Sequence, residues 1–465
     1  MNQRTTAVLF LLLSVLYFAG LSWSGLLSVD EPRYAAIGHG MALSGNWITP
    51  YLWGEPWFEK PPLLFWLIAA ATKVGLPGEW AARLPIAALS LLFLAFFYRR
   101  LRMLFNPDIA LRATFILATT AGWFAYSQVA VTDIPLATTF SAAMLFVAPW
   151  ALERDRGGLL AAALFFALAI LAKAAVPIVL ALPLLYWAGR RFPLLIAPFL
   201  LALAIAAPWY LLCYRANGWP FFEELFLRHH LARFTTGETL HARPFWFYIP
   251  VLLAGVFPWT PLLAALFRRD FVTDPKLRYF LLWFAWGFLF LSASSGKLPG
   301  YLLPLLPALA VLLAHVDSRK LWIAAAVLLA LVLPVAVSVL PIALDRGLSR
   351  ATFTFPLYAI ALALITLAIA WRAARFPAIA ALVLTGLLLA KYPLLKALDH
   401  SASARAEAAE IRRLNLLSLC RGNLRRTWEY QLNYYLAKPI PPCAEDDTTT
   451  PRIESTEDGR LVLPH

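Results

Sequence analysis

The sequence VDEPRYAAIGHGMALSGNWITPYLWGEPWFEKPP, residues 29–62, organises the rest of the chain. It follows directly on a long apolar segment and carries a dense set of polar groups, namely Asp30, Glu31, Arg33, Tyr34, Glu55, Glu59 and Lys60. Charges placed beside a bilayer cost free energy unless they serve a function. The stretch therefore predicts a functional site, and the alternative is a solvated loop whose charges cap helices.

The chain as a whole is too apolar for a soluble protein. Of its 465 residues, 61% are hydrophobic and 14% are charged, and a soluble fold cannot bury so much apolar surface. The formal net charge of +14 does not indicate a nucleic acid partner, because the cytoplasmic loops of membrane proteins collect Lys and Arg. We expect an all-α polytopic membrane protein that contacts membrane lipids and no nucleic acid.

Long apolar runs predict about thirteen membrane-spanning helices, because about 20 apolar residues are needed to cross the hydrocarbon core. They are 6–27, 80–98, 108–126, 134–151, 158–172, 175–188, 192–212, 247–267, 278–293, 300–316, 320–341, 354–371 and 376–392. The first is expected to stay uncleaved, since residues 5–29 contain no charge and no small-x-small cleavage site. The run 61–72 would be only about 18 Å long as a helix, so 61–76 is predicted to lie along the membrane interface.

Arginine-rich turns orient these helices. With 61–76 along the interface, the turns near 99–100, 153–156, 190–191, 268–269, 317–320 and 371–372 all fall on one side. The positive-inside rule makes that side cytoplasmic. The N-terminus is then inside, and the polar stretches gather outside, where they predict a single external site.

This topology divides the chain into two predicted domains. Residues 1–396 form the membrane domain, with external loops at 28–79 and 213–246, and residues 397–465 form a small C-terminal domain outside. Within that domain, 403–415 is predicted as a helix, 428–436 as a helix or strand, and 443–465 as a loose acidic segment.

Two acidic motifs in the first external loop are candidates for catalysis or binding. Asp30 or Glu31 can act as a general base or stabilise positive charge at a sugar carbon, and either can instead cap the helix predicted at 33–43. The motif FEKPP places Glu59, a ligand for hard metals, beside Lys60, a compact charge suited to phosphate. The alternative for this motif is a simple ion pair that starts a helix.

Other external segments add weaker candidates. Asp133 stands at the mouth of the fourth span and can simply cap it. Three of the seven histidines lie within residues 229–241, which favours metal binding or, with Arg233, phosphate binding. Lys297 and Tyr301 can reach an interfacial phosphate, or can anchor the chain at the membrane surface.

Eight motifs, in a fixed order between residues 6 and about 310, resemble one family. They are DExRY at 30–34, SGNW at 44–47, FEKPP at 58–62, WAARLP at 80–85, TDxPL at 132–136, HxxRF at 230–234, HxxPFW at 241–246 and KLPxYxLP at 297–304. The series resembles the C-type (GT-C) membrane glycosyltransferases, in the branch that contains the lipid A aminoarabinose transferases and the protein O-mannosyltransferases. No single motif is specific, whereas the ordered series is.

The resemblance implies an enzyme that moves a sugar from a polyprenyl (undecaprenyl) phosphate carrier to an acceptor, with inversion at the anomeric carbon. It implies a bacterial inner-membrane protein whose site faces the periplasm. The acceptor is left open between lipid A, another envelope glycan and a protein, because only about 70 residues follow the last predicted span. A monomer is expected.

The resemblance also implies residue roles. The catalytic carboxylates would be Asp30 first and Asp133 second, with Glu31 as a further candidate. The donor phosphate would be held by Lys60, Arg233 and Tyr301, with Lys297 and Arg33 as additional candidates. A divalent metal, zinc being the best match to mixed N and O ligands, would be held by Glu59, His230 and His241.

The sequence contains no Walker loop, no GxGxxG after a strand and no DxD motif, so a nucleotide donor has no support. The alternative function class is a transporter or flippase for a lipid-linked sugar. Transporters usually show repeats and polar groups near the bilayer midplane, whereas the polar groups here gather on one face. An enzyme is therefore favoured.

The C-terminal tail predicts one disulfide. Cys420 and Cys443 both lie in the tail that the charge rule places in an oxidising compartment, and Cys213 lies in a different segment. The competing interpretation is two unpaired thiols.

Overall fold

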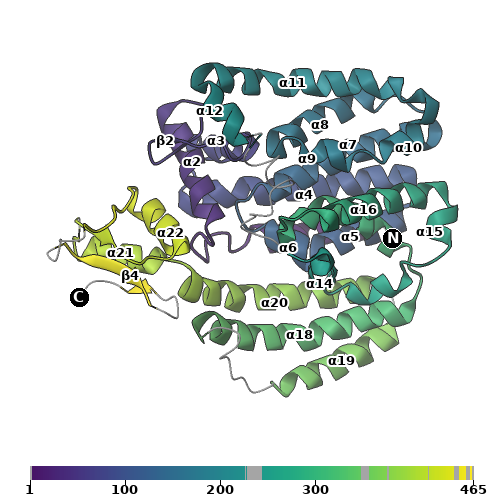
Figure 1. Cartoon of the computed structure of the whole chain (residues 1–465). Helices are drawn as coiled ribbons and strands as arrows, with labels where there is room; N and C mark the ends of the chain where they lie inside the picture. The colour runs from purple at the N-terminus through teal and green to yellow at the C-terminus, as the bar shows by residue number, and fades with distance from the viewer. Residues whose placement is uncertain are drawn as a thin grey trace.

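Long helices run side by side in a computed structural model of the chain and form one bundle (Figure 1). The structure describes residues 3–225, 227, 243–346, 356–373, 376–416, 418–444, 450–456 and 461–462. The helices α2 and α3 and the C-terminal domain lie at one end of the bundle, which we call the α2 end. The two termini lie at opposite ends.

The first part of the chain builds the α2 end. It contains α1 (Gln3–Phe18), α2 (Asp30–Ser44), the hairpin β1 (Tyr51–Leu52) and β2 (Glu55–Pro56), and α3 (Leu63–Lys73). Helix α2 ends where Gly45 adopts a left-handed conformation with φ 72°, which glycine tolerates without steric cost. The predicted helix at 33–43 is thus confirmed, and the short helix predicted near 61–76 is α3.

Two capping hypotheses for the site carboxylates are wrong. Helix α2 begins at Asp30 after Val29, and no side chain caps its first turn. Helix α7 begins at Asp133 after Thr132, again without a side-chain cap. In both cases the carboxylate is engaged with a basic side chain instead of the helix amides.

The middle of the chain supplies most of the bundle. The helices are α4 (Gly78–Leu104), α5 (Pro107–Thr119), α6 (Ala121–Tyr126), α7 (Asp133–Glu153), α8 (Leu159–Lys173), α9 (Val176–Leu180), α10 (Leu184–Ala188), η1 (Gly189–Arg191), α11 (Pro193–Asn217) and α12 (Trp219–Phe222). The predicted span 108–126 is broken at Thr120, and 175–188 is broken between α9 and α10, where Pro183 precedes the second piece.

The last part of the membrane domain continues the bundle. It contains η3 (Phe245–Phe247), α14 (Tyr248–Gly255), η4 (Thr260–Ala265), α15 (Asp270–Thr273), α16 (Pro275–Ala293), η5 (Pro299–Leu305), α17 (Leu306–Ala314), α18 (Arg319–Arg346), α19 (Tyr358–Ala373) and α20 (Phe376–Ala402). Helix α20 extends ten residues beyond its predicted end at 392. Its last turns therefore lead directly into the C-terminal domain.

Five helices within the described residues are long and apolar enough, by length and composition, to cross a membrane: α4, α7, α11, α20 and the 319–339 part of α18. Shorter apolar helices overlap some of the other predicted spans, among them α1, α8 and α19. The structure thus confirms a mostly helical, multi-pass membrane fold.

The arginine-rich turns gather at one end of the bundle, as the sequence predicted. Arg154 donates to the carbonyl of Trp187 at 3.2 Å, and Arg268 donates to the carbonyl of His315 at 3.3 Å. Lys276 joins two further turns through the carbonyl of Leu104. Figure 1 shows α10 and α15, which flank two of these turns, at the end of the bundle opposite to α2.

A small domain follows α20 and contains α21 (Arg405–Arg413), β3 (Cys420–Arg421), α22 (Arg426–Leu436), β4 (Arg452–Ser455) and β5 (Leu461–Val462). The predicted helix at 403–415 is α21, and the segment left open as helix or strand is the helix α22. The expectation of a loose segment after 443 is wrong for β4 and β5. Strand β4 pairs in parallel with β3 and antiparallel with β5.

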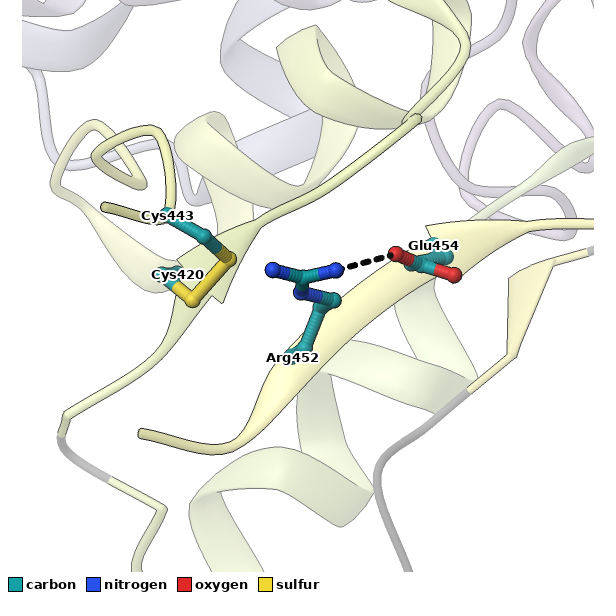
Figure 2. The surroundings of a disulfide bond; sticks show 4 residues. All are labelled: Cys420, Cys443, Arg452 and Glu454. Atoms are coloured by element: carbon teal, nitrogen blue, oxygen red, sulfur yellow. Dashed lines mark ion pairs between the residues drawn. A yellow bond between two sulfur atoms is a disulfide. The ribbon is translucent and has the colours of Figure 1, made fainter. Parts of the chain in front are cut away.

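The disulfide between Cys420 and Cys443 is confirmed, and it closes a loop across this domain. Figure 2 shows it beside β4, where Arg452 pairs with Glu454 at 3.5 Å. Cys213 is buried in α11 and is not disulfide-bonded. A domain of this size has a small apolar core, so a covalent link contributes a large share of its stability.

Candidate functional site

Arg33 joins two of the predicted site carboxylates at the α2 end. Its Nη2 donates to the carboxylate of Asp30, one helical turn earlier, and its Nη1 donates to Oε1 of Glu59 at 3.3 Å. The Arg33 side chain is 7% exposed, whereas Asp30 is 42% exposed. Asp30 therefore keeps part of its carboxylate open while its orientation is held by a buried cation.

Three aromatic rings surround the Arg33 guanidinium. Its central carbon lies 5.0 Å from the ring centre of Trp57, 5.3 Å from that of Tyr34 and 5.8 Å from that of Tyr430. A guanidinium over an aromatic ring gains cation–π attraction, more so when it is removed from water. Trp57 and Tyr34 come from the first loop, and Tyr430 comes from α22 in the C-terminal domain.

Glu31 lies apart from this open site and is fully buried. Its carboxylate forms an ion pair with Arg83 of α4 at 2.6 Å and accepts the amides of Leu27 at 2.7 Å and Ala130 at 3.0 Å. Both oxygens of the Glu31 carboxylate thus accept hydrogen bonds from the protein itself. This arrangement ties the loop before Asp30 to the loop that leads to Asp133.

Asp133 pairs with a lysine that comes from the end of α8. The distance between Nζ of Lys173 and Oδ1 of Asp133 is 2.8 Å, and both side chains are largely buried. The same ammonium lies 4.2 Å from the ring centre of Tyr301. A second carboxylate and cation pair is therefore placed beside a predicted phosphate ligand.

Gly300 allows these groups to approach one another. A Cβ at this position would lie 2.6 Å from the ring of Tyr126 and 3.0 Å from the carboxyl carbon of Asp133. Any side chain at position 300 would force one of these groups to move. The glycine of the KLPxYxLP motif is therefore required for steric reasons.

The two carboxylate clusters share one electrostatic environment. Burial first, and then the negative charges of Asp30, Glu59 and Asp133, raise the pKa of Tyr34 well above its ordinary value, while Arg33 acts in the opposite direction. Asp133 thus acts on the same phenol as the two carboxylates of the first loop. Because Glu31 also joins the loops that lead to Asp30 and Asp133, we treat the two clusters as one candidate site.

Two further predicted phosphate ligands, Lys60 and Lys297, donate to backbone carbonyls. Lys60 follows Glu59 directly and donates to the carbonyl of Glu59 at 3.1 Å. Lys297 is buried and donates to the carbonyls of Ser294 and Arg243, and burial lowers its pKa. Lys297 therefore links the chain at Arg243 to the loop after α16.

Three predicted ligands, Arg233, His230 and His241, lie outside the described residues. Of the predicted metal ligands, only Glu59 is described, and its carboxylate is shared with Arg33. Within the described ranges, no group of three or more His, Cys, Asp or Glu side chains is close enough to hold a metal ion. The described residues alone do not fit a metal centre, so we derive no step through a metal.

Sequence reasoning missed three residues that shape this site. Lys173 had a signal, because a lone charge in an apolar run is unusual in a membrane protein. Arg83 stood inside the quoted WAARLP motif without an assigned partner. Tyr430 had no signal, since nothing in the sequence indicates which ring from the tail meets Arg33.

The candidate site combines the partly exposed carboxylate of Asp30 with the buried positive charges of Arg33 and Lys173. Asp30 can accept a proton or face a developing cationic carbon. Basic groups held nearby can stabilise an anionic leaving group.

Comparison with known proteins agrees with this geometry. A family model described as dolichyl-phosphate-mannose-protein mannosyltransferase matches residues 59–212. An undecaprenyl phosphate-alpha-4-amino-4-deoxy-L-arabinose arabinosyl transferase of Pseudomonas paraeruginosa is 32% identical over 346 residues, which cover 69% of this chain and 61% of the relative. Arabinosyl transferase 1 of Proteus mirabilis, of the same description, is 32% identical over 68% of this chain and 60% of its own length.

Two solved structures share the fold. ArnT from Cupriavidus metallidurans, bound to undecaprenyl phosphate, superimposes with a TM-score of 0.78 and 24% identity, over 96% of this chain and 87% of that one. The arabinosyltransferase EmbB from Mycobacterium smegmatis gives a TM-score of 0.52 and 14% identity, over 98% of this chain and 45% of that one.

The chain shares the fold of these two solved structures. Its sequence resembles the undecaprenyl phosphate-aminoarabinose arabinosyl transferases, and the chain spans about three fifths of the length of these relatives.

Proposed function

We propose that this chain transfers a sugar from a polyprenyl phosphate to an acceptor at the outer face of a bacterial inner membrane. The observation that carries the proposal is the arrangement of Asp30, Glu59 and Asp133 around Arg33 and Lys173 at one end of an apolar bundle. The relatives are named as transferases that use undecaprenyl phosphate-linked aminoarabinose. Their names support the same class of donor for this chain.

The proposed reaction is a single displacement. An acceptor oxygen bonds to the anomeric carbon while the bond from that carbon to the phosphate oxygen breaks, and the electron pair leaves with the polyprenyl phosphate. Attack opposite to the leaving phosphate inverts the anomeric centre. If the acceptor is a hydroxyl group, its proton passes to Asp30, and if it is a phosphate, no base is needed.

Positive charge is the second requirement, because a phosphate leaving group needs charge stabilisation more than it needs an acid. Lys60 and Tyr301 would contact the phosphate, together with Arg233. Lys173 is held beside the Tyr301 ring by Asp133, so it would add positive charge at the same point. Arg33 would act indirectly, by holding Asp30 and Glu59.

The membrane arrangement belongs to the same proposal. We infer about thirteen spans, with the α2 end and the C-terminal domain in the periplasm. The gathering of arginine-rich turns at the opposite end supports this orientation. The acceptor would be lipid A, another envelope glycan or a protein, and the protein would act as a monomer.

A reconstituted assay tests the function. The purified full-length chain in lipid nanodiscs is given a polyprenyl phosphate-linked aminoarabinose and lipid A, and products are identified by mass spectrometry. We expect covalent transfer by the wild type and a loss of about 10²-fold or more for Asp30→Asn. Asp270→Asn is a matched control, because Asp270 also pairs with an arginine but lies exposed far from the site.

The outcomes separate the function classes. Transfer at the wild-type rate by Asp30→Asn would remove Asp30 from the chemistry. Movement of the intact donor across a sealed bilayer, with no covalent product from any of several envelope acceptors, would support a transporter and overturn the proposal.

A further inference from the structure

The C-terminal domain reaches the candidate site through one helix. The helix α22 lies against α2 (Figure 1), and its Tyr430 contacts two groups of the first loop. The ring centre of Tyr430 lies 5.8 Å from the Arg33 guanidinium and 5.0 Å from the ring of Trp53 in the β1–β2 turn. A side chain from the last part of the chain thus contributes to the surroundings of the first loop.

Arg33 depends on its aromatic surroundings for orientation. Its two terminal nitrogens donate to Asp30 and Glu59, but its Nε is buried and has no hydrogen-bond partner among the described residues. Two terminal hydrogen bonds leave the plane of the guanidinium free to tilt, and the rings around it limit that tilt. Removal of one ring would loosen the cation that holds both carboxylates.

Tyr430 is itself held in place. Nη2 of Arg426 donates to the Tyr430 hydroxyl at 3.0 Å, and the Arg426 guanidinium lies 5.1 Å from the ring centre. The ring of Tyr430 therefore contacts two guanidinium groups, one from its own helix and one from the site.

The domain that carries Tyr430 is fixed to the loop before α2. The hydroxyl of Tyr435 donates to Glu79 at 2.9 Å and accepts the amide of Leu26 at 2.7 Å. The carboxylate of Asp399 accepts the amide of Gly25 at 2.8 Å. These part-buried contacts, made by α22 and by the end of α20, hold α22 in place beside α2.

We propose that Tyr430 is a positioning residue for the glycosyl transfer, through which the C-terminal domain completes the site. The Tyr430 ring holds the Arg33 guanidinium in the plane that pairs it with Asp30 and Glu59, and Asp30 then faces the acceptor. This inference rests on the proposed function. It assigns the small domain a part in turnover as well as in stability.

The test compares three variants in the full-length protein. Tyr430→Leu removes the ring, and Tyr430→Phe keeps it. Glu429→Gln, at the adjacent position of α22, removes only a contact with Arg421 at 3.4 Å inside the domain. We expect kcat of Tyr430→Leu to fall about three- to thirtyfold, with the KM for the donor and the melting temperature near the wild-type values.

The conservative variant gives the decisive comparison. Tyr430→Phe should recover most of kcat, and Glu429→Gln should remain within twofold of the wild type. The inference is overturned if Tyr430→Leu turns over within twofold of the wild type. It is equally overturned if Tyr430→Leu has a lowered melting temperature and its loss of kcat is explained by the loss of folded protein. That result would indicate a structural role. Absence of transfer by the wild type would instead reject the proposed function.

Discussion

Glu31 and Arg83 form a bidentate ion pair in the interior, with N–O distances of 2.6 and 2.7 Å and with neither side chain more than 2% exposed. The remaining donors of Arg83 bond to the carbonyls of Leu21, Ser24 and Gly25. This pair fixes the loop immediately before Asp30. The two neighbouring acids of the DExRY motif thus have separate surroundings, one buried and paired and the other open.

Glu31→Gln should therefore impair folding before it impairs chemistry. Loss of one partner leaves the Arg83 charge buried without compensation, which typically costs about 3–5 kcal/mol. We expect a low yield and a low melting temperature, and partial recovery in the double variant Glu31→Leu with Arg83→Met. Normal stability with lost turnover would instead make Glu31 the catalytic carboxylate.

Lys173→Met should lower turnover by about tenfold or more. The substitution leaves Asp133 without its cation and removes positive charge beside Tyr301. Lys173→Arg should retain part of the activity, and Lys73→Met, an exposed lysine at the end of α3, should have no effect. Steady-state kinetics with the lipid-linked donor decides the point, and equal rates for Lys173→Met and the wild type would exclude this role.

Replacement of the disulfide should loosen the C-terminal domain. A loop of 23 residues between Cys420 and Cys443 corresponds to roughly 3 kcal/mol in the loop-entropy model. We expect the double Cys→Ser variant to become sensitive to proteolysis within residues 403–465, whereas Cys213→Ser should not. Non-reducing peptide mapping supplies the control, since free alkylation of both thiols in the wild type would contradict the bridge.

The family resemblance, and not the described residues, implies a zinc site, and this expectation predicts a defined stoichiometry. If Glu59 binds a divalent ion with His230 and His241, elemental analysis of purified wild type should find about one zinc per chain. Because Glu59 would be one of the ligands, Glu59→Ala should remove the ion, and His39→Ala should retain it. The same trace amount in all three proteins would leave these histidines as phosphate ligands or structural groups.

The orientation in the membrane can be checked with introduced cysteines. In a Cys213→Ser background, a membrane-impermeant maleimide added to intact spheroplasts should label His400→Cys and spare Met103→Cys. His400 follows the last span on the side of the C-terminal domain, and Met103 is 70% exposed at the opposite end of the bundle. The reverse pattern would invert the topology.

The helical part of the fold could be predicted because it depends on local patterns. Long apolar runs marked the helices, and arginine-rich turns marked the end of the bundle where they gather. Asp30 and Asp133 were selected by the family resemblance, since their positions at helix starts alone indicated only capping. The breaks at Thr120 and within 175–188 were missed, since apolar content alone does not locate a kink.

The partners of the charged residues could not be predicted. Glu31 meets an arginine 52 residues away, and Asp133 meets a lysine 40 residues away. Such pairs depend on which helices become neighbours, and composition and spacing contain no information on that. For the same reason Arg33 was predicted to bind phosphate, whereas the structure places it between two carboxylates.

The contact between Tyr430 and Arg33 joins the beginning of the chain to its end. A ribosome makes the DExRY motif before the helices that follow it, and adds α22 only after α20 has been synthesised. A nascent chain therefore carries both acids of the first loop long before the ring that covers Arg33 exists. On the proposed role of Tyr430, the chain gains full activity only once α22 has been added, so a product that ends before α22 would turn over slowly.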